Sequence, residues 1–511
     1  MEDLAKLFDT LFSALDAIVT GFLHSLLEVA HDLLDIVIAL HGLSESVNAV
    51  IWTYVLVVLL IGLGLWFTVR SGFVQLRMLS EMFRVLGDGV VRKGNDKGIS
   101  SFQAFCVSTA SRVGVGNIAG VAIAIALGGP GSVFWMWVIA FIGSATGFVE
   151  STLAQIYKIP KEDGGFYGGP AFYIKNALRR NGLARLFAIL ITITFALSYN
   201  SVQANTIASA IHSSFGVPLW IVALALSALT GIVVFGGLHR IAKVAEMIVP
   251  PMAGVYILIA LAVTLINIRA VPDMFATIFR EAFRPSSAVA GGLGAVVING
   301  IKRGLFSNEA GEGSVPNAAA SAVCSHPVKQ GLVQALGVFV DTWFVCSATA
   351  FMILLSGVWR TAGGKTGVVL AQEALVSQFG SWAGYALTMI VLFFAFSSII
   401  GNYFYGEVNI GFFQGTRKHH FTALRALVVG MVFFGCMADL KIVWDLADLC
   451  MGLLSLTNLY AIAHLCPQAF AALSDYASQR RAGRKDPTFS PGRVLGSTRG
   501  VHAWKAADGN D

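Results

Sequence analysis

Residues 108–129 form the stretch that most constrains the fold of this chain. The stretch is apolar enough to enter a membrane, yet it contains Arg112, Asn117 and glycines at positions 114, 116 and 120. A helix interrupted at 114–117 explains these residues, because non-helical backbone at membrane depth is tolerated only where it lines a cavity or is buried in protein. The freed groups can bind a solute: N–H groups at the start of a half-helix suit a carboxylate, and carbonyls or hydroxyls such as those of Ser108 and Thr109 suit a small cation.

A second stretch, residues 299–321, has the same character. It is polar, broken by glycines and flanked by apolar sequence on both sides. The alternative for the first stretch is that Gly116 and Gly120, spaced as GxxxG, only let two helices pack closely. Two interrupted segments in matching positions of two halves favour a transporter site instead.

Composition defines the class of protein. Of the 511 residues, 56% are hydrophobic and only 13% are charged, whereas soluble proteins carry about 25% charged residues. The chain is therefore predicted to be an all-α polytopic membrane protein. Its net charge of +6 indicates membrane topology rather than nucleic-acid binding, because the positive residues fall in loops.

Apolar segments of about 20 residues, the length that spans a bilayer, recur along the chain. Residues 1–48 read as an amphipathic extension lying on the membrane surface, and residues 49–100 as one transmembrane helix followed by a loop rich in arginine and lysine. That loop is predicted to be cytoplasmic, with the N-terminus outside. We expect about eleven spans, at 50–69, 101–127, 131–157, 183–202, 217–237, 247–268, 287–320, 330–356, 381–402, 421–438 and 446–466.

The spans after the first divide into two sets of five. Residues 101–270 form one set and residues 287–466 the other, and the odd number of helices per set inverts the second relative to the first. Each set begins with an interrupted helix, which is typical of inverted-repeat transporters that bind substrate and ion near the bilayer midplane. The polar tail, residues 474–511, is predicted to be cytoplasmic and disordered.

Several long motifs identify a family. They include Arg112-Val-Gly-Val-Gly-Asn-Ile-Ala-Gly, Gly168-Gly-Pro-Ala-Phe-Tyr, Lys302-Arg-Gly-Leu-Phe-Ser-Asn-Glu-Ala-Gly and Val443-Trp-Asp-Leu-Ala-Asp. With Gln203-Ala-Asn, Asp341-Thr and Tyr405-Gly-Glu, they make the chain resemble the alanine or glycine:cation symporter family over about residues 50–466.

The resemblance implies a LeuT-type fold, a 5+5 inverted repeat, and sodium-coupled uptake of a small neutral amino acid, alanine or glycine. It implies no cofactor beyond Na⁺, the only metal expected, and no partners other than the amino acid, Na⁺ and the lipid bilayer: no nucleic acid and no obligate protein. A multi-pass protein of the plasma or inner membrane is expected, with a cytoplasmic C-terminus. The implied substrate-binding residues are Val115, Gly116, Asn117, Gln203, Phe306, Ser307, Asn308 and Gly311, and the implied sodium-binding residues are Ser108, Thr109, Ser397 and Ser398.

Four positions depart from the family pattern. Glu312 stands where an apolar residue is usual, Asn402 where an aromatic is common, and Met451 and Thr457 where asparagine and proline are usual. These positions are expected near the pocket wall, so the substrate can differ from alanine. Phe306, at the second helix break, is expected to line the pocket; simple core packing is the alternative.

Ionisable residues at membrane depth cost about 2.5 to 3.5 kcal/mol each on insertion scales, so they are expected to have partners or functions. The candidates are Arg112, Glu150, Arg303, Glu309 and Asp341. One interpretation is a structural ion-pair network. The other is a gate, in which Arg112 or Arg303 pairs with Glu309 or Glu150 in one state and releases it in another.

The sequence also bears on other classes of function. No zinc-protease, serine-hydrolase or Cys-His motif is present in the sequence, so an enzyme is not expected. A proton-coupled transporter is the nearest alternative, with Glu309 as its titratable group. A channel or a nutrient sensor built on a transporter fold also stays open.

Overall fold

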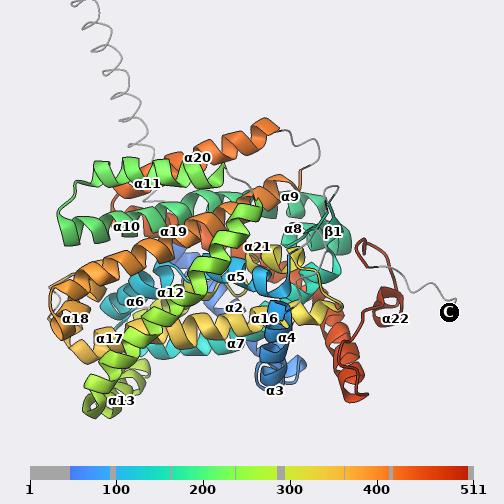
Figure 1. Ribbon diagram of the computed structural model, residues 1–511. Helices are drawn as coiled ribbons and strands as arrows, with labels where there is room; N and C mark the ends of the chain where they lie inside the picture. Colours follow the sequence, from blue (N-terminus) through green and yellow to red (C-terminus); the bar gives the residue numbers. More distant parts are fainter. Residues whose placement is uncertain are drawn as a thin grey trace, which may run out of the picture.

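The structure is a computed structural model that describes residues 47–91, 99–161, 164–235, 238–284, 294–361, 363–413 and 418–504. It is a bundle of helices, with one short two-stranded sheet in the described residues (Figure 1). The predicted amphipathic helix within residues 1–48 lies almost entirely outside the described residues, as does the start of the second predicted repeat at 287–293.

The N-terminal half contains the first interrupted helix. Its described elements are η1 (Ile51–Leu56), α2 (Val57–Arg70), α3 (Val74–Arg77), α4 (Leu79–Val91), α5 (Ser101–Arg112), η2 (Gly116–Gly120), α6 (Val121–Gly128), α7 (Gly131–Ile156), β1 (Ile159–Pro160), β2 (Phe166–Tyr167), α8 (Pro170–Tyr173), η3 (Ile174–Leu178), α9 (Asn181–Ile191), η4 (Thr192–Tyr199), α10 (Asn200–Phe215), α11 (Leu219–Val234), α12 (Leu238–Ile266), η5 (Ile268–Ala270) and α13 (Val271–Ala282).

The C-terminal half begins with the second interrupted helix. Its described elements are α14 (Ala295–Asn308), α15 (Val315–Ser321), α16 (Pro327–Phe339), η7 (Val340–Cys346), α17 (Ser347–Ser356), η8 (Val358–Arg360), α18 (Gly367–Phe379), α19 (Trp382–Ile410), α20 (Lys418–Met437), α21 (Leu440–Arg481) and α22 (Pro491–Leu495).

Each of the eleven predicted spans corresponds to a helix or a broken helix. By length and apolar composition, seven described helices qualify as membrane spans, and two sharply bent helix pairs bring the number to nine. The all-α polytopic class is therefore confirmed. The number eleven and the inverted repeat stay predictions.

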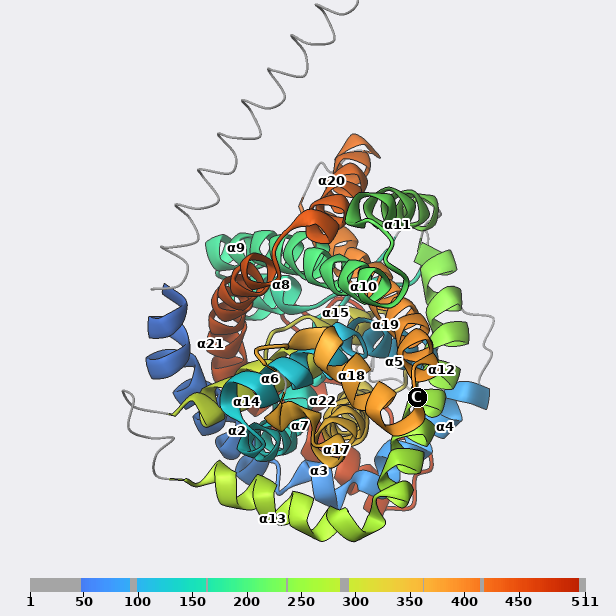
Figure 2. The same ribbon diagram turned by 90° about the vertical axis from the view of Figure 1, so that its left-hand side faces the viewer.

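The interrupted helices occupy the centre of the bundle. Nearly every residue from Val107 to Ile125 is buried, and so is every residue from Arg303 to Ala322. Helix α7 packs against α14, α15 and α16, while α5 packs against α12, α15, α16 and α19. Figure 2 shows α5 and α6 surrounded by the longer helices, with α11 and α20 side by side at one edge.

The tail corrects one prediction. Helix α21 continues to Arg481, and residues 482–504 fold back onto the bundle rather than being disordered. Phe489 donates its backbone N–H to the Ser325 carbonyl at 3.1 Å, and Trp504 donates its indole N–H to the Gln155 carbonyl at 2.8 Å. The prediction was based on the polar composition of the tail and did not take these two aromatic residues into account. Their ring centroids lie 5.2 Å apart.

Candidate functional site

The first helix break lies between α5 and η2, where the axis bends by 50°. Helix α5 ends at Arg112 and the chain resumes at Gly116, so the break falls within the predicted region. A Cβ at Gly114 would lie 2.2 Å from the Ser398 hydroxyl oxygen and 3.0 Å from Gln203 Oε1. Only glycine permits this close approach, which brings the break against α10 and α19.

Backbone donors at this break are held by side chains. Val115 donates its N–H to Gln203 Oε1 at 3.1 Å, and Gly114 donates its N–H to Asn117 Oδ1 at 2.9 Å. Because the first N–H groups of a helix lack partners within the helix, such donors are available to an anionic group when the side chains give way. The structure thus brings together three predicted substrate residues, Val115, Asn117 and Gln203.

The second break, residues 309–314, is built on left-handed backbone. Glu309, Gly311 and Gly313 have φ values of 57°, 101° and 82°, and the first is unusual for a residue with a side chain. Two hydroxyls hold the Glu309 carboxylate: Ser111 donates to Oε1 at 2.7 Å and Ser314 to Oε2 at 2.6 Å. Since Ser111 lies on α5, Glu309 connects the two broken helices.

Asp341 on η7 forms a second connection between them. Its Oδ1 accepts a hydrogen bond from Asn117 Nδ2 at 2.7 Å, and its Oδ2 accepts one from the Ser307 hydroxyl at 2.7 Å. Thr342 also donates to Oδ2, at 3.0 Å. One buried carboxylate thereby fixes the position of both breaks.

Aromatic rings cover one side of the first break. A Cβ at Gly116 would lie 2.9 Å from Phe306 Cδ1, so Phe306 faces the break directly. Its ring centroid lies 4.6 Å from that of Tyr199 and 4.7 Å from that of Trp444. Three rings from α14, η4 and α21 therefore form a wall beside Val115 and Gly116.

The remaining predicted substrate residues lie farther along the second break. Asn308 donates from Nδ2 to the Thr342 hydroxyl at 3.2 Å. Gly311 donates its N–H to Glu150 Oε1 at 3.2 Å, and its carbonyl accepts from Asn458 Nδ2 at 2.9 Å. The structure places Gly311 against α7 and α21, not beside the first break.

The predicted sodium residues are divided in the same way. The Ser398 hydroxyl donates to the Ala110 carbonyl of α5 at 2.9 Å, whereas Ser397 donates within its own helix, to Phe394 O at 2.8 Å. Thr109 is buried, and its hydroxyl has no hydrogen-bond partner among the described residues. Ser108 donates to Gln334 Oε1 on α16 at 2.7 Å.

The two arginines of the predicted gate have different surroundings. Arg303 pairs with Asp448 on α21, and its guanidinium lies 4.5 Å from the centroid of the Trp444 ring. Arg112 donates to the Gln334 carbonyl at 3.3 Å, and its Nε and Nη2 have no hydrogen-bond partner among the described residues. Neither arginine forms an ion pair with Glu150 or Glu309 in the described part of the chain.

The four departures from the family pattern are all packed inside the protein or against its helices. Glu312 accepts a hydrogen bond from the Tyr199 hydroxyl at 3.1 Å through Oε2, while its buried Oε1 has no partner in the described residues. Asn402 Oδ1 lies 2.8 Å from the Ser111 hydroxyl oxygen, and Asn402 Nδ2 donates to Asn200 Oδ1 at 3.1 Å. Met451 is buried, and Thr457 donates to the Leu454 carbonyl of its own helix.

Three contributors escaped the sequence reasoning. Ser111, Asp448 and Asn458 lie in predicted spans and bond to Glu309, Arg303 and Glu150, respectively. Their one signal in the sequence was that each is a polar residue within an apolar span. The sequence does not show which polar residues contact each other, because that depends on how the helices pack. Asp341 was recognised only as an ionisable residue at membrane depth, not as the link between the breaks.

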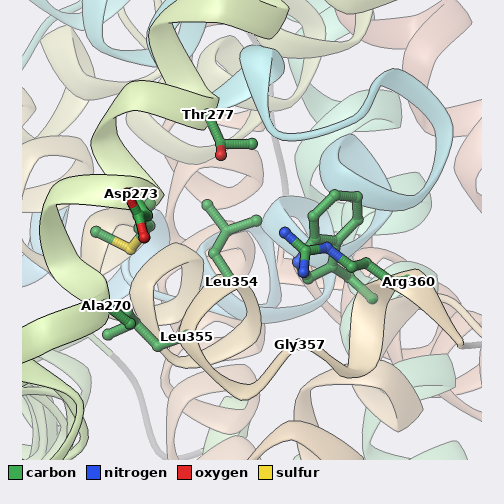
Figure 3. Close-up of a pocket in the computed structure, with 9 residues that line it drawn as sticks. Ala270, Asp273, Thr277, Leu354, Leu355, Gly357 and Arg360 are labelled. Atoms are coloured by element: carbon green, nitrogen blue, oxygen red, sulfur yellow. The ribbon is translucent and has the colours of Figure 1, made fainter.

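A separate cavity of about 230 Å³ lies between α13, the end of α17 and η8. Figure 3 shows Asp273 and Arg360 on opposite sides of it, with Leu354 between them. Thr349, which donates to the Asn117 carbonyl, is eight residues before Gly357, or about 12 Å along a helix at ~1.5 Å per residue. This cavity is therefore distinct from the helix breaks.

Proteins named as symporters or amino-acid carriers match nearly the whole chain. A probable sodium/glutamine symporter, GlnT of Bacillus subtilis, is 50% identical over 90% of this chain and 95% of its own length. The amino-acid carrier protein AlsT of the same organism is 50% identical over 89% of this chain and 96% of its own. The sodium/alanine symporter AgcS of Methanococcus maripaludis is 36% identical over 82% and 94% of the two chains.

Among solved structures, a manganese transporter of Eremococcus coleocola superposes with a TM-score of 0.45 at 13% identity, covering 77% of this chain and 83% of that one. The likeness is too distant to show a shared fold. The sequence comparison is much more informative than this structural likeness. Residues 38–491 match the family described as the sodium:alanine symporter family. The chain therefore belongs to the sodium:alanine symporter family and is a transporter, not an enzyme.

Proposed function

We propose that this protein is a secondary active transporter that couples sodium entry to the uptake of a small neutral amino acid, alanine or glycine, by alternating access. The observation that carries the proposal is the meeting of the two helix breaks, joined through Asp341 and flanked by Gln203 and Phe306. Broken helices that face each other across a pseudo-repeat are the usual place for substrate and ion in such transporters.

The proposed substrate position lies at Val115 and Gly116. The substrate carboxylate takes the N–H of Val115, which Gln203 Oε1 now accepts at 3.1 Å. The Gln203 side chain then bonds to the substrate instead of to Val115. The rings of Phe306, Tyr199 and Trp444 limit the size of the substrate's side chain. A small residue such as alanine fits this crowded wall.

The proposed sodium position lies between α5 and α19. Ser398 supplies a hydroxyl, and the end of α5 supplies the Ala110 carbonyl, which Ser398 already contacts. Thr109 brings a buried hydroxyl without a partner among the described residues. Oxygen atoms of this kind are the ligands that small hard cations prefer.

Glutamine is the second candidate substrate. A relative with 50% identity bears the name of a probable sodium/glutamine symporter, and Glu312 presents a buried carboxylate oxygen without a partner in the described residues. Such an oxygen can accept a hydrogen bond from a substrate amide. Proton coupling is supported in turn by a relative with 39% identity that is named as a sodium/proton-dependent alanine carrier protein.

The gate, the LeuT-type 5+5 arrangement and the orientation of the termini stay part of the proposal. Arg112 interacts electrostatically with Glu150 and Glu309, and its two nitrogens without a partner among the described residues allow it to pair with either glutamate in another state. Arg303 holds Asp448 in this state.

Uptake into proteoliposomes tests the proposal. Labelled alanine, glycine and glutamine are offered under separately imposed sodium, potassium and proton gradients, with wild type and Gln203→Ala compared. Accumulation of alanine or glycine under sodium, lost in the variant, is the expected result. Glutamine accumulation would support glutamine as the substrate. Accumulation under a proton gradient alone would show that protons, not sodium, are the coupling ion. If no solute accumulates, the transporter proposal is wrong and a sensor or a channel is the remaining function.

A further inference from the structure

A cavity of about 340 Å³ lies where the C-terminal tail meets the bundle. The core contributes Tyr157 after α7, Asn176 and Arg179 of the η3 region, and Gln468 of α21; the tail contributes Ser497 and Arg499. Figure 1 shows α22 on the side of the bundle where β1 and α8 lie. Because two separate parts of the chain form its walls, the cavity exists only while the tail is docked.

The lining carries positive charge without a compensating acid. Arg179 and Arg499 both line the cavity, and none of the described residues that line it is acidic. The hydroxyl of Ser497 and the side-chain amides of Asn176 and Gln468 add neutral polar groups. Two guanidinium groups with neutral polar neighbours are the arrangement that recognises phosphate oxygens.

Backbone geometry brings the tail close to η3 beside the cavity. Arg179 has a φ of 58° at the end of η3, a left-handed conformation that is uncommon for a residue with a side chain. On the opposite wall, Gly500 follows Arg499 with a φ of 77°, and a Cβ there would lie 2.4 Å from the Asn176 carbonyl oxygen. The tail therefore approaches η3 as closely as a backbone can.

We propose that this cavity binds a phosphate group and that the bound phosphate holds the tail against the bundle. The volume equals that of about eleven water molecules at ~30 Å³ each, so it accommodates a phosphate with part of its attached alcohol. A ligand that binds only the docked tail shifts the tail toward that state by mass action. This inference does not depend on which amino acid or ion is transported.

The phosphate has two possible sources with the same chemistry. The exposed apolar residues Leu186 and Ile189 of α9 begin a few residues after Arg179, and the guanidinium of Arg180 lies 5.6 Å from the centroid of the Tyr460 ring. Exposed apolar side chains suit the acyl chains of an anionic phospholipid whose phosphate lies in the cavity. A soluble phosphate from the aqueous side offers the same oxygens.

Hydrogen exchange of residues 495–504 in the full-length protein tests the proposal and separates the sources. Inorganic phosphate is titrated into protein in uncharged detergent; in parallel, the protein is placed in nanodiscs of phosphatidylcholine alone or with one-third phosphatidylglycerol. Slowing of exchange by about fivefold or more in the first arm identifies soluble phosphate, and in the second arm only, a lipid headgroup. Unchanged exchange in both arms overturns the proposal.

Variants locate the effect. Arg179→Gln with Arg499→Gln is expected to remove the protection, while Arg481→Gln, an exposed arginine of α21 outside the cavity, keeps it. Equal protection in the double variant and the wild type would refute the site.

A glycine pair gives a second, independent comparison. Gly500→Ala is expected to weaken protection about tenfold, because its Cβ meets the Asn176 carbonyl. Gly496→Ala suffers similar strain from a φ of 66° but has nothing within 4 Å of its Cβ, so protection should stay within twofold of wild type. If both alanine variants retain full protection, the tail does not form the wall of the binding site.

Discussion

Single side chains decide which of the predicted cation ligands face the first helix break. Ser397 and Ser398 are neighbours in sequence and equally plausible as ligands, but only Ser398 contacts the Ala110 carbonyl of α5. The difference arises because consecutive residues of a helix point in directions about 100° apart. The sequence therefore predicts Ser397 and Ser398 as a pair, but only the packing of the helices shows that Ser398 is the one that faces α5.

This contrast gives a matched pair of variants. Ser398→Ala is expected to raise the sodium concentration for half-maximal uptake about tenfold, because losing a ligand worth about 1.4 kcal/mol changes an affinity tenfold. Ser397→Ala should change it less than twofold, since the Ser397 hydroxyl bonds only within its own helix among the described residues, whereas that of Ser398 also reaches the Ala110 carbonyl of α5. Sodium titration of uptake in proteoliposomes measures both, and equal effects would contradict the assignment of Ser398.

At the scale of the element, the first helix break depends on a glycine. Gly114→Ala would place a Cβ 2.2 Å from the Ser398 oxygen, and overpacking of this kind typically costs about 1 to 3 kcal/mol. We expect uptake to fall more than tenfold in a protein that still purifies as a folded species. Gly120→Ala, whose Cβ meets nothing closer than 3.6 Å, should retain most activity; equal loss in both would point to general helix damage.

The start of α16 depends on a histidine that is neutral. His326 Nδ1 accepts the Val328 N–H at 3.2 Å, and Nε2 lies 3.2 Å from Asp475 Oδ2. Burial lowers the pKa of His326, as do the charges of Lys329 and Arg493, whereas Asp475 raises it less than burial lowers it. Because the unfolded chain binds this proton more readily, stability present above about pH 6.5 is lost as the pH falls below it.

His326→Asn tests this helix cap. An asparagine oxygen can still accept the Val328 N–H, but it takes up no proton, so the variant should lose less thermal stability between pH 7 and pH 5 than the wild type. Differential scanning fluorimetry across that range measures the effect. The exposed His464→Asn is the control, and an unchanged pH profile in His326→Asn would exclude the cap as its origin.

The helices themselves were predictable, while some of their connections were not. Glycines and Asn117 within an apolar stretch located the first break to within two residues, since an uninterrupted membrane helix cannot use them. Phe489 and Trp504 in a polar tail gave no comparable signal, because two aromatic residues dock only where the folded bundle presents a complementary surface, and the local sequence does not show that surface. Likewise, nothing in the sequence paired Arg303 with Asp448, which are 145 residues apart.

On the scale of the whole molecule, residues from the two ends of the described chain are tied together. Glu81 on α4 accepts a hydrogen bond from the Tyr476 hydroxyl at 2.6 Å and pairs with Arg84 and Arg480. Burial raises the pKa of Glu81, but the hydrogen bonds from Arg84 and Tyr476 and the charges of both arginines outweigh it and lower the pKa to about 2. Helix α4 is thereby fastened to the end of α21.

Glu81→Gln is expected to destabilise the protein by about 1 to 3 kcal/mol at pH 7, as a charged hydrogen-bond acceptor is lost. The folded-state pKa lies below the unfolded value of about 4.5, so this stabilisation is present above pH 4.5 and lost as the pH falls toward 2. The variant should therefore show a shallower acid decline in thermal unfolding. Asp88→Asn, which removes a half-exposed partner of Arg84, should have little effect, and an acid decline as steep as that of wild type in Glu81→Gln would exclude Glu81 as its source.

The packing of Trp504 also determines the reactivity of an amine. Lys158 lies 5.2 Å from the centroid of the Trp504 ring and 3.9 Å from that of Phe166, and burial lowers its pKa to about 8. An amine with such a pKa is partly unprotonated at neutral pH, hence nucleophilic, but the aromatic cover keeps reagents away. A truncation at residue 491, where the family match ends, would strip away the indole, so that Lys158 becomes accessible to acylating labels while its pKa rises toward that of an ordinary lysine, a practical consideration for anyone who shortens or tags this end of the chain.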